Sequence, residues 1–248
     1  MTEKPIISVV MSAYNNADTL ATAMDSILSQ EGVQLEFIVV NDGSTDGSAT
    51  ILEDYARRDA RVRVVHQENT GLTRALIRGC SLARAPWIAR QDADDISLPG
   101  RLRKQLDAVR ANPLIVLVGC QSRCRTTEGD LLSDVSAPFH LDEARNQVLK
   151  LGRSISPHGT IIFSRAVYEA IGGYRDAFCF AQDLDLNIRL VERGEVLALP
   201  ECLYEYRYAP DAISGSHADR QAAFRALILE SQKKRAAGES DDSTLEDA

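Results

Sequence analysis

The chain has 248 residues, of which 44% are hydrophobic and 26% are charged, a composition that excludes wholesale disorder. It holds no uncharged stretch near the roughly 18–20 apolar residues of a membrane span, and its first residues lack a signal-peptide layout. The net charge of −8 is uneven, because residues 239–248 carry five acids and no base, which leaves 28 bases and 31 acids elsewhere. This near-neutral body argues against nucleic acid as the main partner. Residues 237–248 are predicted to form a disordered acidic tail.

The five cysteines indicate a reducing compartment. Their number is odd and no secretion signal precedes them, which favours reduced thiols and a cytoplasmic protein. Cys120 and Cys124 have the spacing of a metal pair, but a second Cys/His pair at ligand spacing is absent from the sequence. We therefore expect buried thiols at these two positions and no zinc.

The first hundred residues alternate between strand and helix patterns. Short apolar runs at 6–11, 35–40, 62–65 and 87–89 are typical of buried strands, and segments with helical spacing separate them. Four such units predict an α/β fold with a parallel sheet and helices on both faces. Ligands of such sheets bind beyond the carboxyl ends of the strands, so the loops 12–18, 41–47, 67–74 and 91–98 are the candidate site.

The second half is less regular. We expect a strand at 114–119, a hairpin over 120–136 and a helix over 140–151, then a strand at 160–163 and a helix to residue 171. A helix from about residue 184 to 193, two edge strands at 196–199 and 203–206 and a last helix near 224–228 follow. With no internal repeat or evident linker, residues 1–236 are predicted to form one domain of two lobes.

Three side chains at the predicted strand ends suggest chemistry. Asp92 and Asp94 follow a buried strand, where two carboxylates can share a Mg²⁺ or Mn²⁺ ion; a solvated acidic loop is the alternative. Asp42 could accept a hydrogen bond from a nucleobase or close an Asx turn, and Tyr14 could stack on a base or pack in the core. Residues 12–16 contain no glycine, which argues against a dinucleotide-binding fingerprint.

Together these motifs resemble those of the family 2 glycosyltransferases, inverting enzymes of the GT-A fold that use nucleotide-sugar donors. The resemblance covers about residues 5–210. The matching segments are residues 8–15, 37–46, 69–72, 87–99, 163–174 and 181–186. It implies a GT-A fold in which residues 1–111 bind the nucleotide sugar and residues 112–236 bind the acceptor.

The resemblance also implies roles for individual residues. Asp42 would bind the base with Tyr14 packed on it, and Asp183 would be the general base. Asp94, with Asp92, would bind the divalent cation, Mn²⁺ or Mg²⁺. Arg74 would reach the diphosphate, although a solvated helix-face arginine is the alternative. The remaining donor-side residues are Ser12, Ala13, Gly43 and Ala93, and the acceptor-side residues are His158, Gln182 and Asp185.

Three positions depart from the family pattern, one of them Arg78, which stands where an asparagine is frequent. Gln182 stands where a glutamate is frequent before the catalytic aspartate, and Ala209 stands where a histidine is frequent, a role His217 could take instead. A GT-A protein that binds nucleotide but has lost activity is therefore an alternative. A sugar nucleotidyltransferase is a further one, although it would be expected to carry a Gly-rich, Lys-containing loop after the first strand.

The expected reaction is a metal-assisted single displacement. The sugar of a nucleotide-diphosphate donor, expected to be a UDP-sugar, passes to a hydroxyl of a glycan or lipid-linked acceptor in cell-surface glycan synthesis. Membrane contact would be peripheral, at the inner face of the membrane. Lys233, Lys234 and Arg235 at the end of the last helix could touch anionic lipid or stay solvated.

Overall fold

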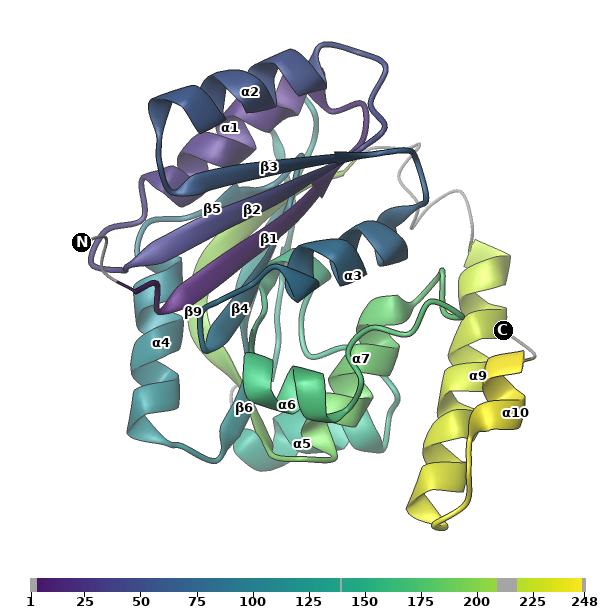
Figure 1. Ribbon diagram of the computed structural model, residues 1–248. Helices are drawn as coiled ribbons and strands as arrows, with labels where there is room; N and C mark the ends of the chain where they lie inside the picture. Colours follow the sequence, from purple (N-terminus) through teal and green to yellow (C-terminus); the bar gives the residue numbers. More distant parts are fainter. Residues whose placement is uncertain (1–3, 139, 209–217, 247–248) are drawn as a thin grey trace.

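The computed structural model describes residues 4–138, 140–208 and 218–246, and it shows a curled sheet between two layers of helices (Figure 1). The strands are β1 Ile7–Ala13, β2 Leu35–Asp42, β3 Val62–Gln67, β4 Trp87–Asp92, β5 Ile96–Ser97, β6 Ile115–Arg125, β7 Leu131–Val135, β8 Ile162–Ser164 and β9 Glu195–Arg207. Their order is β3-β2-β1-β4-β8-β6-β9-β5, and β7 pairs with β6.

The helices divide between the two faces of the sheet. They are α1 Ala17–Leu28, α2 Ser48–Arg58, α3 Leu72–Ser81, α4 Arg101–Ala111, α5 Leu141–Leu149, the 3₁₀ turn η1 His158–Thr160, α6 Arg165–Ala170, α7 Gln182–Val191, α9 Ala218–Ala236 and α10 Asp242–Glu246. Apolar residues of α1, α2 and α4 pack in one cluster. Those of α3, α5, α6, α7 and α9 pack in the other. Because side chains alternate along a strand, Val9 and Val10 of β1 face different clusters.

The register of the parallel strands brings the predicted loops to one edge of the sheet. β1 pairs in parallel with both β2 and β4, with Ala13 opposite Asn41 and Ser12 opposite Asp92. β3 continues this arrangement beside β2. The predicted parallel sheet is confirmed, and the carboxyl ends of β1, β2 and β4 lie side by side.

β9 corrects the prediction of two edge strands. Residues 195–207 form one strand, which lies between β6 and β5 inside the sheet. Its register against β6 shifts where Cys120 pairs with Leu199 and Gln121 pairs with Cys202. The irregularity accommodates Pro200, which cannot donate a ladder hydrogen bond and which separates the two apolar runs in the sequence.

The C-terminal segment differs from the disordered tail that the sequence predicts. Residues 237–246 are described, and α10 packs against α9 with Thr244 buried. Asp241 forms ion pairs of 2.7 Å with both Arg175 and Arg235. Burial alone would raise the pKa of Asp241, but hydrogen bonds from Ser231 and the two arginines lower it. The two arginines therefore hold Asp241, a residue of the predicted acidic tail, in a fixed position.

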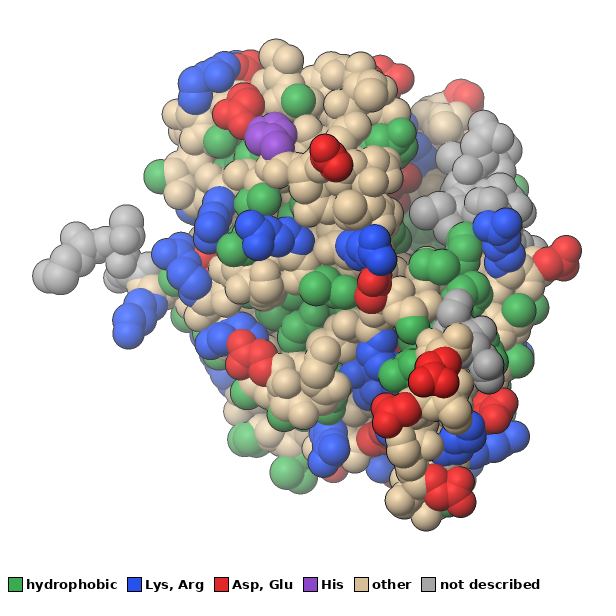
Figure 2. Space-filling view, turned by 45° about the vertical axis from the view of Figure 1, so that its right-hand side comes forward, with side chains coloured by type: hydrophobic (Ala, Val, Ile, Leu, Met, Phe, Trp, Pro, Cys, Tyr) green, Lys and Arg blue, Asp and Glu red, His purple; other side chains and the backbone are tan. Residues whose placement is uncertain are grey.

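The basic end of α9 is also engaged within the chain. Lys234 pairs with Glu230, and Arg235 pairs with Glu192 as well as with Asp241. Figure 2 shows acidic and basic side chains interspersed around these C-terminal helices. Lys234 and Arg235, two of the three bases considered for lipid contact, are therefore paired with acids. The end of α9 is not a surface of unpaired basic side chains at these two positions.

The cysteines and the helices agree with two further expectations. All five cysteines are free, and Cys120 and Cys124 are buried, as predicted. In the part of the chain that the structure describes, no helix is both long and apolar enough to cross a membrane.

Candidate active site

The loop after β1 places Tyr14 at the strand-end edge with 48% of its surface exposed. Ala13 beside it is wholly buried, whereas Ser12 is half-buried. The loop is tied to the β2–α2 loop, because the backbone N–H of Asn15 donates to Ser44 Oγ and that of Ala17 donates to Asp46. The aromatic ring is thus held on a fixed loop and open to a ligand.

Asp42, at the end of β2, organises the neighbouring β3–α3 loop. Its carboxylate is buried and accepts hydrogen bonds from Gln67 Nε2 (2.7 Å) and from the backbone N–H groups of Thr70 (3.0 Å) and Gly71 (2.9 Å). Gly43 follows with φ +76°, and a Cβ there would lie 2.6 Å from the backbone nitrogen of Asn69. The nucleobase contact of Asp42 stays a prediction, but the residue has a structural task as well.

Two buried arginines lie beneath the acidic end of β4. Arg90 pairs with Asp92 and donates to the carbonyls of Val10 (3.1 Å) and Gln91 (2.7 Å). Arg101 donates to the carbonyl of Arg90 (2.9 Å), and its own pKa is lowered by burial. Sequence reasoning assigned neither residue a role. The positive charges of the two arginines favour the ionised form of the carboxylates at the end of β4.

Of the next two carboxylates of this loop, Asp94 is half-buried and Asp95 is buried. Burial and the adjacent charge of Asp92 raise the pKa of Asp94 to about 6. Asp95 accepts hydrogen bonds from Tyr204 Oη and the backbone of Arg207, both at 2.9 Å, and burial raises its pKa well above the usual value. Ala93, between Asp92 and Asp94 in the chain, is buried, and its carbonyl accepts a hydrogen bond from Thr19 Oγ1.

The donor set of this loop fits a hard divalent cation. Asp92 and Asp94 supply carboxylate oxygens, and the crowding that raises the pKa of Asp94 would be relieved by a positive ion. No group of three or more His, Cys, Asp or Glu side chains suited to a metal occurs in the described ranges. The two aspartates therefore fit a site that substrate oxygens complete, as Mg²⁺ often requires.

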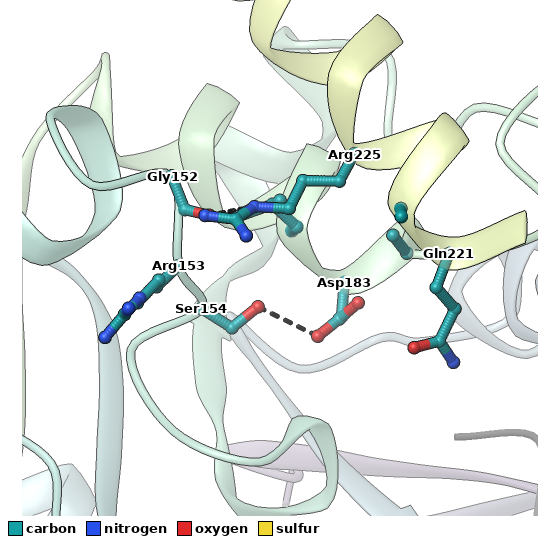
Figure 3. Close-up of a pocket in the computed structure, with 9 residues that line it drawn as sticks. Gly152, Arg153, Ser154, Asp183, Gln221 and Arg225 are labelled. Carbon is teal, nitrogen blue, oxygen red and sulfur yellow. Dashed lines mark hydrogen bonds between the residues drawn. The ribbon is translucent and has the colours of Figure 1, made fainter. Parts of the chain in front are cut away.

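Asp183 lies in the first turn of α7, facing a pocket of about 430 Å³ (Figure 3). It accepts a hydrogen bond of 2.8 Å from Ser154 Oγ. Burial raises the pKa of Asp183, and the negative charge of Asp92 adds to the shift. The preceding Ala181 has φ +53°, a left-handed conformation that is costly outside glycine and that sets the direction of the helix start. The base candidate and the metal-site candidate therefore interact electrostatically.

His158 lies between the acidic loop and α7. Its Nε2 lies 2.6 Å from Tyr174 Oη, and burial lowers its pKa well below the usual value, so the ring is neutral. The next residue, Gly159, is so close to the acidic loop that a Cβ would meet Asp92 Oδ2 at 2.8 Å and Tyr204 Oη at 2.0 Å.

The structure corrects the expected acceptor role of Asp185. Its carboxylate is 1% exposed and is enclosed by Arg175 and Arg189, with the Arg189 Nη2–Oδ2 distance at 2.6 Å. Asp185 lies two positions after Asp183, and residues at that spacing point to different sides of a helix. The side chain therefore packs inside the protein instead of meeting a substrate.

The other expected residues have mixed placements. Gln182 is buried beside Asp183. Arg74 is exposed, and its Nε–H donates a bifurcated hydrogen bond to both carboxylate oxygens of Asp176 (2.8 and 2.9 Å), so its approach to a diphosphate would require this ion pair to break. Ala209 and His217 lie outside the described residues.

Comparison with known proteins decides the family. The family described as Glycosyl transferase family 2 matches residues 8–172, which span most of the strand-end edge. The chain belongs to glycosyltransferase family 2. This membership separates it from the sugar nucleotidyltransferases.

Curated relatives of this family 2 glycosyltransferase include proteins of Bacillus subtilis. The uncharacterized glycosyltransferase EpsJ is 32% identical over 218 residues, which cover 85% of this chain and 63% of EpsJ. The putative glycosyltransferase EpsE is 32% identical over 86% of this chain and 76% of its own length. An Escherichia coli chondroitin synthase is 28% identical over 77% of this chain, which corresponds to 27% of the synthase. The chain thus spans less than two thirds of EpsJ and about a quarter of the synthase.

Solved structures place the glycosyltransferase in the GT-A fold. Staphylococcus aureus TarS 1–349 in complex with UDP-GlcNAc superposes with a TM-score of 0.71 at 15% identity, over 94% of this chain and 73% of that one. The Pyrobaculum calidifontis mannosyltransferase PcManGT, in complex with GDP-Man and Mn²⁺, gives 0.66 at 20% identity, over 96% and 66%. The expected GT-A fold is confirmed.

Proposed function

We propose that this glycosyltransferase moves the sugar of a UDP-sugar to an acceptor hydroxyl by a metal-assisted inverting displacement. The observation that carries the proposal is the placement of three carboxylates in this family 2 chain: Asp92 and Asp94 lie at the end of β4 and just after it, and Asp183 faces a pocket from the first turn of α7. In this proposal Asp92 and Asp94 would bind the cation beside the diphosphate, and Asp183 would meet the acceptor hydroxyl. Inverting transfer needs this division of tasks.

The proposed chemistry assigns a proton step to Asp183. A hydroxyl that attacks the anomeric carbon must lose its proton, and a carboxylate with a raised pKa is a stronger general base than an exposed one. Ser154 fixes the orientation of the carboxylate, and neutral His158 adds no charge nearby. A divalent cation held by Asp92 and Asp94 would stabilise the negative charge of the departing nucleoside diphosphate. Inverting displacement requires no protein nucleophile.

The relatives support a class of donor and a class of acceptor. TarS binds UDP-GlcNAc in a structure of the same fold, which supports UDP as the nucleotide, with Tyr14 and Asp42 at the base. Ser12, Ala13, Gly43 and Ala93 would line the donor. The similarity to chondroitin synthase and to a Pasteurella multocida hyaluronan synthase supports a glycan acceptor in polysaccharide synthesis.

A nucleotide panel tests the proposed donor. With Mn²⁺ present, UDP at about 100 times its Kd should add ~2.7 kcal/mol of stability and raise Tm by about 5–10 °C. GDP, CDP and dTDP at the same concentration should give smaller shifts. Differential scanning fluorimetry measures the shift, and release of UDP from UDP-sugars measures the activity. A larger stabilisation by GDP would contradict the UDP assignment, and binding without UDP release would favour an inactive nucleotide-binding protein.

Asp94→Ala tests the cation site. Because a bound cation contributes several kcal/mol of transition-state stabilisation, kcat should fall by about 100-fold or more, and the activity should no longer respond to added Mn²⁺. The matched control is Asp107→Ala on the exposed face of α4, which should keep the wild-type metal titration. An unchanged metal titration in Asp94→Ala would remove this residue from the cation site.

Ser154→Ala tests the proton step through its pH dependence. The base acts only when ionised, so activity is present above the pKa of Asp183 and is lost as the pH falls through it. The Ser154 hydroxyl lowers that pKa, and its removal should raise the pKa further and move the acid limb of the kcat profile to higher pH. The measurement is kcat from about pH 4 to 8. A limb that stays in place would show that Asp183 does not control it.

A further inference from the structure

The pocket in front of Asp183 has an unusual charge balance. It is lined by residues 152–154, by the start of α7 and by one side of α9; the lining residues are Gly152, Arg153, Ser154, Ala181, Asp183, Leu184, Gln221, Ala222 and Arg225. Apart from Asp183, its charged residues are Arg153 and Arg225. Neither arginine takes part in any ion pair found within residues 4–138, 140–208 and 218–246. Two arginines that form no ion pair with the described residues therefore border the base candidate.

Arg225 is held in place by neutral partners. Its Nε donates to the carbonyl of Gly152 (3.1 Å) and its Nη2 donates to the carbonyl of Leu151 (3.0 Å). Figure 3 shows the guanidinium lying over Gly152 at the side of the pocket. A guanidinium has five N–H donors, so these two bonds leave others for a ligand. The carbonyls orient the group without cancelling its charge.

The wall that carries Arg225 is packed firmly against the start of α7. The ring of Phe224 lies 5.6 Å from that of Phe180 and 6.4 Å from that of Phe178, and Arg220 lies over the ring of Phe180. Arg153 is exposed and extends away from Asp183 at the outer rim (Figure 3). The two arginines therefore frame the pocket at different distances from the base.

We propose that the acceptor carries an anionic group, a phosphate or a carboxylate, that binds Arg225 and Arg153 while its hydroxyl meets Asp183. This inference rests on the proposed function. Arginine forms bidentate hydrogen bonds with both anions, and its charge offsets the repulsion that an anionic acceptor would meet from Asp183. The donor diphosphate is assigned to Asp92 and Asp94 at the strand ends, so the arginines of α9 and the 152–154 segment serve the other substrate.

The test compares charged and neutral sugars on the full chain saturated with UDP and Mn²⁺. Ligand-observed NMR titration measures the binding of glucose 6-phosphate, glucuronate and methyl glucoside. At least one charged sugar should bind about tenfold or more tightly than the neutral one, and the stronger of the two identifies the anion. Arg225→Gln and Arg153→Gln should each reduce this preference, whereas Arg225→Lys should keep part of it. Arg63→Gln, at an exposed position of β3, should leave it unchanged.

The outcomes separate this proposal from the one on which it rests. Equal affinity for the charged and neutral sugars in a protein that binds UDP would overturn the anionic acceptor. An equal weakening of UDP binding by Arg225→Gln would overturn it as well, since the arginine would then serve the donor. Arg153→Gln guards against a folding effect at α9, because this side chain projects from an exposed rim. Failure of UDP to bind the wild-type protein would instead contradict the proposed donor.

Discussion

Asp183→Asn should lower kcat by about 10²–10⁴-fold while the affinity for the nucleotide donor stays close to that of the wild type. The range is the usual contribution of a general base, which an amide cannot replace. Donor binding should persist because Asp183 lies at the start of α7. The proposed contacts with the cation and with the nucleobase lie at the ends of β4 and β2. Steady-state UDP release gives kcat, and a UDP titration by fluorimetry gives the affinity.

The control for this variant is Asp130→Asn, at the exposed turn of the β6–β7 hairpin. It makes the same chemical change away from the pocket and should leave both quantities as they are. Wild-type turnover in Asp183→Asn would remove the residue from the proton step. A matching loss of UDP affinity would show that the substitution disturbs the donor site, and the assignment of separate tasks would fail.

Asp185→Asn should destabilise the fold by about 3–5 kcal/mol, although the site beside it needs no carboxylate at this position. Removal of one partner from a buried ion pair leaves uncompensated charge in the interior. Among the described residues Arg189 forms its ion pair with Asp185, whereas Arg175 pairs with both Asp185 and Asp241. Urea unfolding followed by circular dichroism measures the free energy. The effect should appear as a lower midpoint with an unchanged slope.

Asp142→Asn serves as the matched control for the second variant. Asp142 is exposed in the first turn of α5, so its loss should cost only the roughly 0.3–1 kcal/mol of a favourable helix-end charge. If Asp185→Asn is as stable as this control, the buried network contributes little. In that case the position would again be open to an acceptor role.

The nucleotide-binding half was predictable because its strands are nearly continuous apolar runs. All eight residues of β2 are buried, as expected for a parallel strand with helices on both faces. The register of such strands aligns their carboxyl ends, so the sequence already grouped Tyr14, Asp42 and Asp92 at one edge. Physical rules that act over a few residues were sufficient there.

The acceptor half depends on contacts that a local pattern does not contain. The shift beside Pro200 that joins two apolar runs into β9 requires the partner strand. Full burial of Arg90 and Arg101 is unusual for charged residues, and it is explained by the ion pair of Arg90 with Asp92 and by hydrogen bonds from both guanidinium groups to backbone carbonyls. Helical spacing alone, however, could have separated Asp185 from Asp183.

One wall of the pocket that Asp183 faces is α9, which follows the strands of the sheet in the sequence. This has a consequence for how such enzymes diversify. Residues 218–246 supply α9 and α10 after the strands of the sheet are complete. They pack against α7 and the segment before it through the Phe224 contacts and the ion pair of Asp241 with Arg175. The proposed donor residues lie before position 100. Exchange of the last helices between homologues could therefore graft a new acceptor preference onto an unaltered donor site, which makes C-terminal chimeras a direct route to redesigned specificity.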